Sequence, residues 1–263
     1  MEILSDPENV NAENSDDLSE KSRSREIGHD VFLLSVLIPA FNEERTIREL
    51  LSRVEAAPYE KQIIVVDDGS TDKTSEIISE YEDLPGYLVL RHDRNRGKGA
   101  AIRTAISHAD GHVCIVQDAD LEYDPDDYPL LVEIIRRGYS DVVYGSRYVS
   151  GKNDLPFTKF KVGVLFLNFL VRLLYRHPMT DEATCYKAFR TSLLKDIPLT
   201  CERFEFCPEV TARVIRRGHR IIEVPITFHY RTVAEGKKIN WKDFLEAVWC
   251  LLECRFRPEK RLG

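Results

Sequence analysis

The chain has 263 residues, 43% of them hydrophobic, and a formal net charge of −7 at pH 7. This length suffices for one α/β domain with a full core and a short appendage, and the acidic balance disfavours a nucleic-acid partner, so we expect none. The six cysteines include no Cys-x-x-Cys pair, so we expect free thiols and a cytoplasmic location.

Residues 1–26 carry eight acidic and three basic side chains, and few large apolar ones. Such a composition cannot bury enough apolar surface to fold. The segment also lacks the basic start and apolar centre of a signal peptide. We therefore predict a disordered acidic tail over 1–30 and a folded domain over 31–240.

Apolar, β-branched runs alternate with helical patterns between Leu34 and Gly145. The runs predict strands near 34–39, 62–67, 87–91, 112–117 and 141–145. The intervening patterns predict helices over 43–56, 72–82, 98–109 and 127–137. Such alternation indicates a mostly parallel sheet with helices on both faces, an α/β fold of the Rossmann-like kind.

The alternation stops after Arg147, where residues 148–157 predict a loop. The apolar run 162–171 is too short to span a bilayer, and it predicts either a core helix or one in a membrane interface. Residues 241–263 predict an amphipathic helix followed by a basic tail, with an apolar stripe formed by Phe244, Val248, Leu251, Leu252 and Phe256. The stripe either packs on the sheet or lies on a membrane surface, which would make the protein peripheral on the cytoplasmic face.

The motif Asp118-Ala119-Asp120 ends the apolar run 112–117. Side chains two residues apart on a strand lie on the same side, and desolvating two like charges is costly unless a cation neutralises them. Oxygen ligands favour Mg²⁺ or Mn²⁺, which usually hold substrate phosphates. The motif predicts a nucleotide-diphosphate site, with two exposed aspartates in a turn as the alternative.

Two earlier strands also end in polar groups. The run Pro-Ala-Phe-Asn-Glu-Glu over 39–44 follows the first strand, and Asp-Asp-Gly-Ser over 67–70 follows the second. In an open α/β sheet, ligands bind at the carboxyl ends of the strands. We therefore expect the three motifs to meet at one site.

In order and spacing, these motifs resemble the family 2, GT-A-fold glycosyltransferases, and especially the polyprenyl-phosphate hexosyltransferase branch typified by dolichol-phosphate mannose synthase. The resemblance covers about Ser35 to Trp249 and also rests on the segments 94–100 and 145–148. It implies a GT-A fold and metal-dependent, inverting transfer of a hexose. The implied donor is a nucleotide-diphosphate sugar of the UDP-glucose or GDP-mannose type, and the implied acceptor is a polyprenyl or dolichyl phosphate.

The resemblance also implies roles for individual residues. Those implied in nucleotide-sugar binding are Pro39, Phe41, Glu43, Val66, Asp68, Asp118, Ala119, Arg231 and Lys237. Those implied as ligands of Mg²⁺ or Mn²⁺ are Asp118, Asp120 and Glu122, which continue the strand on one side. Those implied in catalysis are Asp118, Asp120, Arg147 and Asp181. Arg147 would contact donor or acceptor phosphate, since a guanidinium fork suits that group. Arg231 and Lys237 would clamp the diphosphate, with a solvated basic loop as the alternative.

The segment 94–100 lacks the spacing of an ATPase phosphate loop. Its glycines, Gly97 and Gly99, predict close helix–sheet packing, with Arg96 or Lys98 near the donor phosphate.

The acceptor stays open, because Phe160 and Val164 stand where the mannose synthases have Arg and Ser. Lys159 and Lys161 are the candidate replacements. A second hypothesis is therefore a GT-A enzyme that acts on a sugar hydroxyl of a lipid or polysaccharide, with Asp181 as general base. A third is a catalytically silent sugar-nucleotide-binding partner of a membrane complex.

Overall fold

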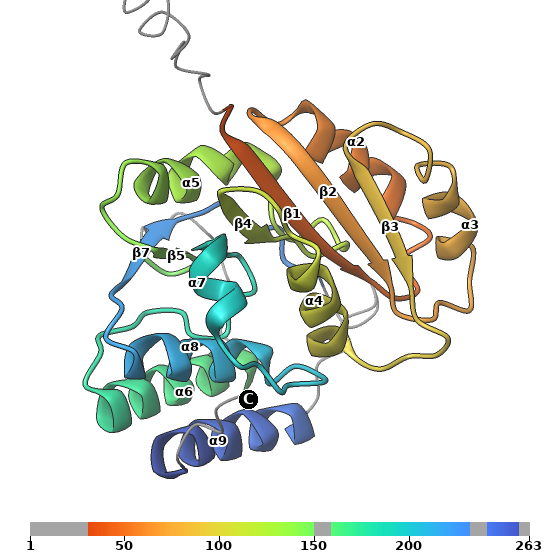
Figure 1. Cartoon of the computed structure of the whole chain (residues 1–263). Helices are drawn as coiled ribbons and strands as arrows, with labels where there is room; N and C mark the ends of the chain where they lie inside the picture. Colours follow the sequence, from red (N-terminus) through yellow and green to blue (C-terminus); the bar gives the residue numbers. More distant parts are fainter. Residues whose placement is uncertain (1–30, 150–158, 232–240, 258–263) are drawn as a thin grey trace, which may run out of the picture. The chain divides into compact units, whose positions relative to one another are not determined.

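The computed structural model describes residues 31–149, 159–231 and 241–257, so the predicted acidic tail and the last basic residues lie outside it. From Phe32 onward the chain forms one unit. Within the described residues, this unit is built on a seven-stranded sheet of order β3-β2-β1-β4-β6-β5-β7 (Figure 1). The strands are β1 (Leu33–Ala40), β2 (Glu60–Asp67), β3 (Tyr87–Arg91), β4 (Val113–Val116), β5 (Val142–Ser146), β6 (Lys187–Arg190) and β7 (Ile221–Pro225).

The helices that connect or cover these strands follow the expected alternation as far as β5. They are α2 (Ile47–Ala56), α3 (Thr74–Ser79), α4 (Lys98–Ser107), α5 (Tyr128–Arg136), α6 (Lys159–Tyr175), α7 (Thr191–Asp196), α8 (Phe206–Arg216) and α9 (Trp241–Phe256). The five predicted strands and four predicted helices are all present. Strand β6 was not predicted, and it runs antiparallel to both β4 and β5, whereas the other pairings are parallel. The prediction of a mostly parallel α/β sheet is confirmed.

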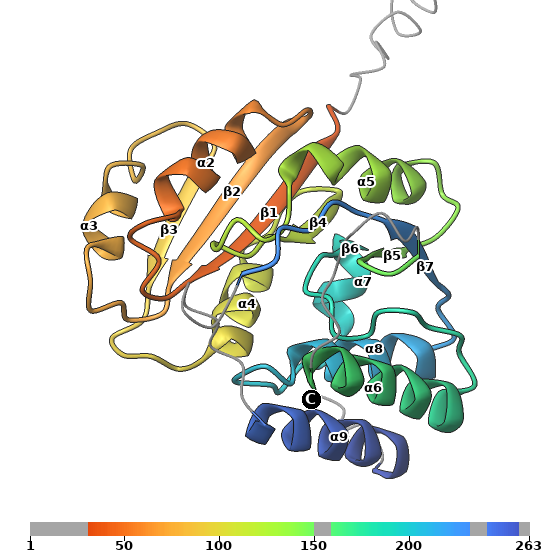
Figure 2. The ribbon, with the colours of Figure 1, turned by 180° about the vertical axis from the view of Figure 1, so that it is seen from behind.

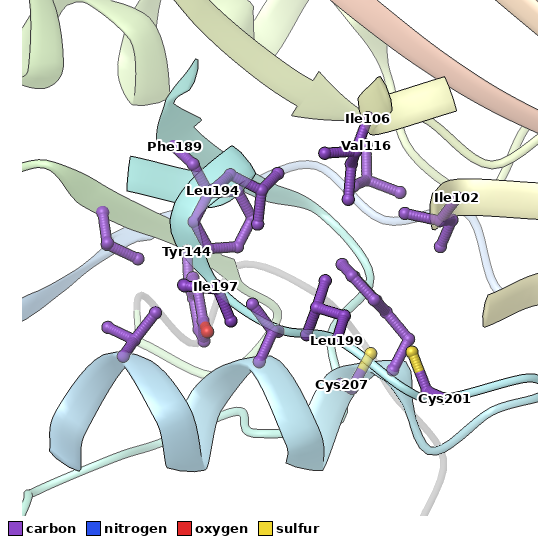
Figure 3. Close-up of a cluster of buried hydrophobic side chains, with 14 of the residues drawn as sticks. Ile102, Ile106, Val116, Tyr144, Phe189, Leu194, Ile197, Leu199, Cys201 and Cys207 are labelled. Atoms are coloured by element: carbon purple, nitrogen blue, oxygen red, sulfur yellow. The ribbon is translucent and has the colours of Figure 1, made fainter. Parts of the chain in front are cut away.

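The sheet is buried on both faces because alternate side chains of each strand enter different cores. Leu37 and Val66 face a core that includes α4, α7 and α8, whereas Val36 and Val65 face one that includes α2 and α5 (Figures 1 and 2). Figure 3 shows the first core, in which Tyr144, Phe189, Leu194, Ile197 and Cys207 are among the packed side chains. Burying one such large apolar side chain contributes about 1.5–3 kcal/mol to folding.

Helices α6 and α9 lie side by side next to α8 (Figure 2). Their inner faces belong to the core, since Val171 and Leu251 are fully buried. The rings of Phe166 and Phe244 join the two helices at a distance of 5.8 Å. Their outer faces are apolar as well, with exposed Val162, Leu165, Phe166, Phe169 and Leu173 on α6 and Trp241, Leu245, Trp249 and Phe256 on α9. Phe256, predicted in the stripe with Leu251, is 75% exposed. In the part of the chain that the structure describes, no helix is long and apolar enough to cross a membrane.

The chain after β4 turns instead of continuing as a strand, which corrects the expectation for Asp120 to Glu122. Leu121 has a left-handed backbone with φ 61°, and the Asp120 side chain accepts a hydrogen bond from the Glu122 N–H at 3.0 Å. A short acidic side chain that bonds the backbone two residues on is a common way to form a turn. Glu122 therefore owes its position to this turn and not to strand alternation.

Candidate active site

A cavity of about 1390 Å³ lies at the carboxyl ends of β1, β2 and β4 and extends to α6 and α9. Polar residues line the end near the sheet: Glu43, Asp68, Asp118, Asp120, Glu122, Lys98 and Arg231. Apolar residues line the end near the two helices: Val162, Val164, Leu167, Phe244 and Ala247. The volume exceeds the roughly 300–1,000 Å³ of an ordinary small-molecule site, so the cavity has room for more than one substrate.

Each of the two aspartates that follow β4 faces a cation. Lys98 Nζ lies 2.6 Å from Asp118 Oδ1, and Arg231 donates a hydrogen bond to Asp120 Oδ2 at 2.8 Å. Burial and the neighbouring Asp118 carboxylate raise the pKa of Asp120. Although burial opposes its charge, Lys98 has a raised pKa, chiefly because Asp118 lies beside it.

Arg231 contacts three acids that come from different parts of the chain. Besides Asp120, its guanidinium lies 3.5 Å from Glu43 Oε2, and its backbone N–H donates to Glu122 Oε1 at 3.1 Å. Asp120 and Glu43 raise the pKa of Arg231 despite its burial. Arg231 is thus the counter-ion of Glu43 and Asp120, as Lys98 is of Asp118. Lys237, its predicted companion, lies outside the described residues.

The acids fit a divalent cation as a pair and not as the predicted set of three. Asp118 Oδ1 is buried and, despite its short distance to Lys98, has no hydrogen bond of ordinary geometry. Glu122 is turned to the backbone of Arg231, and the described residues contain no group of three acidic, histidine or cysteine side chains arranged to hold a metal. Mg²⁺ commonly takes one or two carboxylates and completes its shell with substrate phosphates and water. Asp118 and Asp120 suit that arrangement.

Most of the residues implied in nucleotide binding line the cavity, namely Pro39, Phe41, Glu43, Asp68 and Ala119. Val66 does not, because it is fully buried in the core of β2, and we assign it no contact with a ligand. Asp68 also has a structural role that the sequence did not predict. Its carboxylate accepts hydrogen bonds from the N–H groups of Arg96 and Gly97 and lies 2.6 Å from His92 Nδ1. It therefore fixes the loop that leads into α4.

The glycines of this loop pack against another loop and not against the sheet, which corrects the prediction. Gly97 has φ +98°, and a Cβ on it would lie 2.3 Å from the Glu202 carbonyl oxygen. The Gly99 N–H donates to the Arg203 carbonyl oxygen at 2.9 Å. Close contact with residues 202–203 thus sets the start of α4, and with it the position of Lys98.

Arg147 and Asp181 form a buried ion pair. The Asp181 carboxylate accepts hydrogen bonds from Arg147 Nε at 2.7 Å, from Nη2 at 2.7 Å and from the backbone N–H at 3.0 Å. Arg147 lines the cavity and lies over the ring of Phe228, whereas Asp181 is fully buried and lines no part of it. Asp181 raises the pKa of Arg147 although burial opposes it. Asp181 is therefore a positioning residue for Arg147, and its predicted role as general base does not fit this geometry.

Two cavity residues of the same segment were missed by sequence reasoning. Glu182 is fully buried, neither of its carboxylate oxygens has a hydrogen-bond partner among the described residues, and burial raises its pKa to about 7. Cys185 lies with its Sγ 2.9 Å from Lys98 Nζ. No sequence motif predicts either residue, because only the fold brings residues 182–185 against α4 and α8.

Residues 35–198 match the family described as Glycosyl transferase family 2. Among curated relatives, the chain is 35% identical over 230 residues to an uncharacterized protein from Methanocaldococcus jannaschii, covering 84% of this chain and 90% of the relative. It is 31% identical to the UDP-N-acetylglucosamine–dolichyl-phosphate N-acetylglucosaminyltransferase of Methanococcus voltae, covering 79% and 90%. It is also 31% identical to the dolichol-phosphate mannosyltransferase of Pyrococcus furiosus, covering 78% of this chain and 58% of that protein.

Solved structures agree on the fold. The glucosyl-3-phosphoglycerate synthase of Mycobacterium tuberculosis, crystallised with Mn²⁺, UDP and phosphoglyceric acid, superposes with a TM-score of 0.68 at 20% identity, covering 88% of this chain and 81% of that one. The TarS protein of S. aureus with UDP-GlcNAc gives a TM-score of 0.57 at 22% identity, covering 84% and 66%. The chain therefore belongs to glycosyl transferase family 2 and is a glycosyltransferase with a GT-A fold.

Proposed function

We propose that the protein transfers a hexose from a nucleotide-diphosphate sugar to a polyprenyl phosphate, with inversion and with Mg²⁺ or Mn²⁺. The observation that carries this proposal is the composition of the cavity, which passes from a cluster of acids and cations at the sheet to an apolar end between α6 and α9. A lipid phosphate matches both ends, because its head is anionic and its tail is apolar. The names of the relatives from M. voltae and P. furiosus support the same acceptor class.

The donor would occupy the end near the sheet. Phe41 offers an apolar surface to the base, and Glu43 and Asp68 offer acceptors to base N–H groups and ribose hydroxyls. Asp118 and Asp120 would hold the metal ion, which would neutralise charge on the diphosphate leaving group. Arg231, now paired with Asp120 and Glu43, would turn its guanidinium toward the phosphates once the cation takes its place beside Asp120.

The acceptor phosphate would lie near Arg147 and Lys161, two cations that line the cavity. Lys161 lines the cavity with its Nζ 5.7 Å from the centre of the Tyr148 ring, over which Arg147 also lies. The Asp181 carboxylate binds the Arg147 guanidinium through two hydrogen bonds, so the guanidinium is oriented before the acceptor binds. A phosphate oxygen is already an anion at neutral pH and needs no general base, which agrees with a sealed Asp181.

The lipid tail would leave the cavity between α6 and α9, whose outer faces expose the apolar residues named above. The two helices and the residues that directly follow them also carry exposed basic side chains: Arg172, Arg176, Lys242, Arg255 and Arg257. Tryptophan with basic neighbours suits the headgroup region of an anionic membrane. We infer that the protein lies peripherally on a membrane with this surface.

One observation favours a second candidate, transfer to a sugar hydroxyl. Glu182 belongs to the cavity wall, and its pKa of about 7 is that of an effective general base at neutral pH. Its oxygens are sealed from solvent, however, so it would have to move before it could reach a hydroxyl. We therefore place this candidate second, and Asp181 has no role as base in it. The silent-partner hypothesis is not retained, because the chain is a glycosyltransferase.

The proposal is tested by radiolabel transfer to a short polyprenyl phosphate from UDP-glucose, GDP-mannose and UDP-N-acetylglucosamine in separate reactions with titrated Mg²⁺ or Mn²⁺. Asp120→Asn should lower metal-dependent transfer by about 100-fold or more, because it removes one of two carboxylate ligands. The matched control is Glu44→Gln, which alters an exposed acid that lies outside the cavity. Full activity of Asp120→Asn would remove the metal assignment, and no lipid product from any donor would argue against the acceptor.

A further inference from the structure

Two cysteine thiols meet in the wall of the cavity. Cys185 follows the segment that carries Asp181, and Cys207 lies in the first turn of α8. Their Sγ atoms are 3.5 Å apart, and Cys207 Sγ also donates to the Thr184 carbonyl oxygen at 3.3 Å. A disulfide has an S–S bond of about 2.0 Å, so about 1.5 Å of relative movement would close the bridge.

The surroundings make the two thiols unequal. Cys185 is partly exposed and contacts Lys98 Nζ, whereas Cys207 is buried. The Cys207 thiol, with a contribution from Lys98, lowers the pKa of Cys185, and Cys185 together with burial raises the pKa of Cys207. A partly exposed thiol beside a cation, with a second thiol next to it, is the usual arrangement of an attacking and a resolving cysteine.

We propose that Cys185 and Cys207 are an oxidant-sensitive pair that a peroxide closes into a disulfide in the wall of the active site. The Cys185 sulfur attacks one oxygen of hydrogen peroxide, the O–O bond breaks, and a sulfenic acid and one water result. The Cys207 sulfur then attacks the Cys185 sulfur, the S–O bond breaks, and the departing oxygen takes the Cys207 proton as a second water. The two thiols lose two electrons in total, and the peroxide gains them.

The bridge would change the donor end of the cavity through Lys98. In the reduced protein Lys98 contacts both Asp118 and Cys185, and the disulfide would draw the Cys185 sulfur toward α8 and weaken the second contact. It would also tie the segment that positions Arg147 to the start of α8. We therefore expect reversible loss of transfer, a part of the inference that rests on the proposed function.

The test treats the full chain with hydrogen peroxide and maps its peptides without reduction. The expected result is a Cys185–Cys207 cross-linked peptide with a mass loss of about 2 Da, removed by dithiothreitol. Cys250→Ala/Cys254→Ala is the matched control, because it removes the two thiols spaced one turn apart on α9 and should leave the cross-link intact. Cys207→Ala should abolish it and leave Cys185 as a sulfenic acid that dimedone traps.

Peptide mapping uses the wild-type chain, so its result depends neither on the folding of a variant nor on transfer activity. No cross-link, or one that joins Cys207 to Cys201 or Cys250 to Cys254, would overturn the pair. A Cys185–Cys207 bridge with undiminished transfer to an acceptor that the reduced enzyme uses would overturn the regulatory part. If the reduced enzyme transfers nothing, the proposed function fails, while the mapping result still decides whether the thiol pair exists.

Discussion

Glu182 gives the most quantitative prediction of the structure. Its carboxyl group is fully buried, and neither oxygen makes a hydrogen bond of ordinary geometry among the described residues. Burial raises its pKa from an ordinary 4.5 to about 7, although the Lys187 charge and the Thr211 hydroxyl act in the opposite direction. Between these two values the folded protein binds the proton and the unfolded chain does not. The stability that this group contributes is therefore full below pH 4.5, and it falls as the pH rises to about 7.

The expected size follows from the separation of the two pKa values. Each pH unit between them is worth about 1.4 kcal/mol, so ionising Glu182 inside the fold costs about 3 kcal/mol. Glu182→Gln keeps the shape of the protonated acid but cannot ionise. Relative to the wild type, the variant should gain about 3 kcal/mol of unfolding free energy between pH 4.5 and pH 8.

The assay is urea unfolding followed by far-UV circular dichroism at several pH values, for both proteins. The variant can differ from the wild type at every pH, because its amide is also unpartnered; only the change of the difference with pH carries the prediction. If the difference in unfolding free energy between the variant and the wild type stays constant from pH 5 to pH 8, the prediction is refuted. Glu182 would then have the same pKa in the folded and the unfolded protein.

Three further predictions concern other parts of the fold. Gly97→Ala should lower stability by about 1–3 kcal/mol in urea unfolding, because Gly97 has φ +98° and a Cβ there would lie 2.3 Å from a carbonyl oxygen; an unchanged midpoint would contradict this. Burial raises the pKa of Glu209, but hydrogen bonds from Thr200 and Arg213 and the charge of Arg213 outweigh it and lower that pKa. Glu209→Gln should therefore be less stable than the wild type at pH 7 and approach it as the pH falls below about 4.5. A stability difference that grows in acid would contradict this. Trp249→Ser should weaken flotation with anionic liposomes, whereas Leu130→Ser, which alters an exposed apolar side chain on α5, should not. Equal losses of flotation in the two variants would mean that α9 is not the membrane surface.

The positions of the first five strands along the chain were predictable because each is an apolar run bounded by turn residues, and the carboxyl ends of parallel strands meet at one edge. Strand β6 was not predictable in this way. It is only four residues long and contains Lys187, a residue that is normally exposed. Lys187 is tolerated because its Nζ donates to the Glu182 carbonyl oxygen and lies 3.5 Å from the centre of the Tyr144 ring, contacts that only the folded chain creates.

In the candidate site, too, some residues could be predicted from local sequence and others could not. The acids after β1, β2 and β4 were found because strand ends mark them, but their counter-ions come from distant segments. Arg231 is 111 positions from Asp120, and no local pattern reports that pairing. Asp181 was a candidate base because of its position after the acceptor segment, and only the packing shows that Arg147 occupies its carboxylate. Charge pairing across the fold is what a single sequence does not reveal.

The central claim is that the acceptor nucleophile is a lipid phosphate. The most direct measurement compares a short polyprenyl phosphate with the corresponding polyprenol, under identical conditions and with each labelled donor. A labelled lipid is expected from the phosphate and none from the alcohol, because Arg147 and Lys161 would bind an anionic head group, and Asp181 and Glu182, the acids considered as a general base, are both fully buried. Labelling of the alcohol or of a sugar hydroxyl, with none of the phosphate, would contradict the account and favour the second candidate.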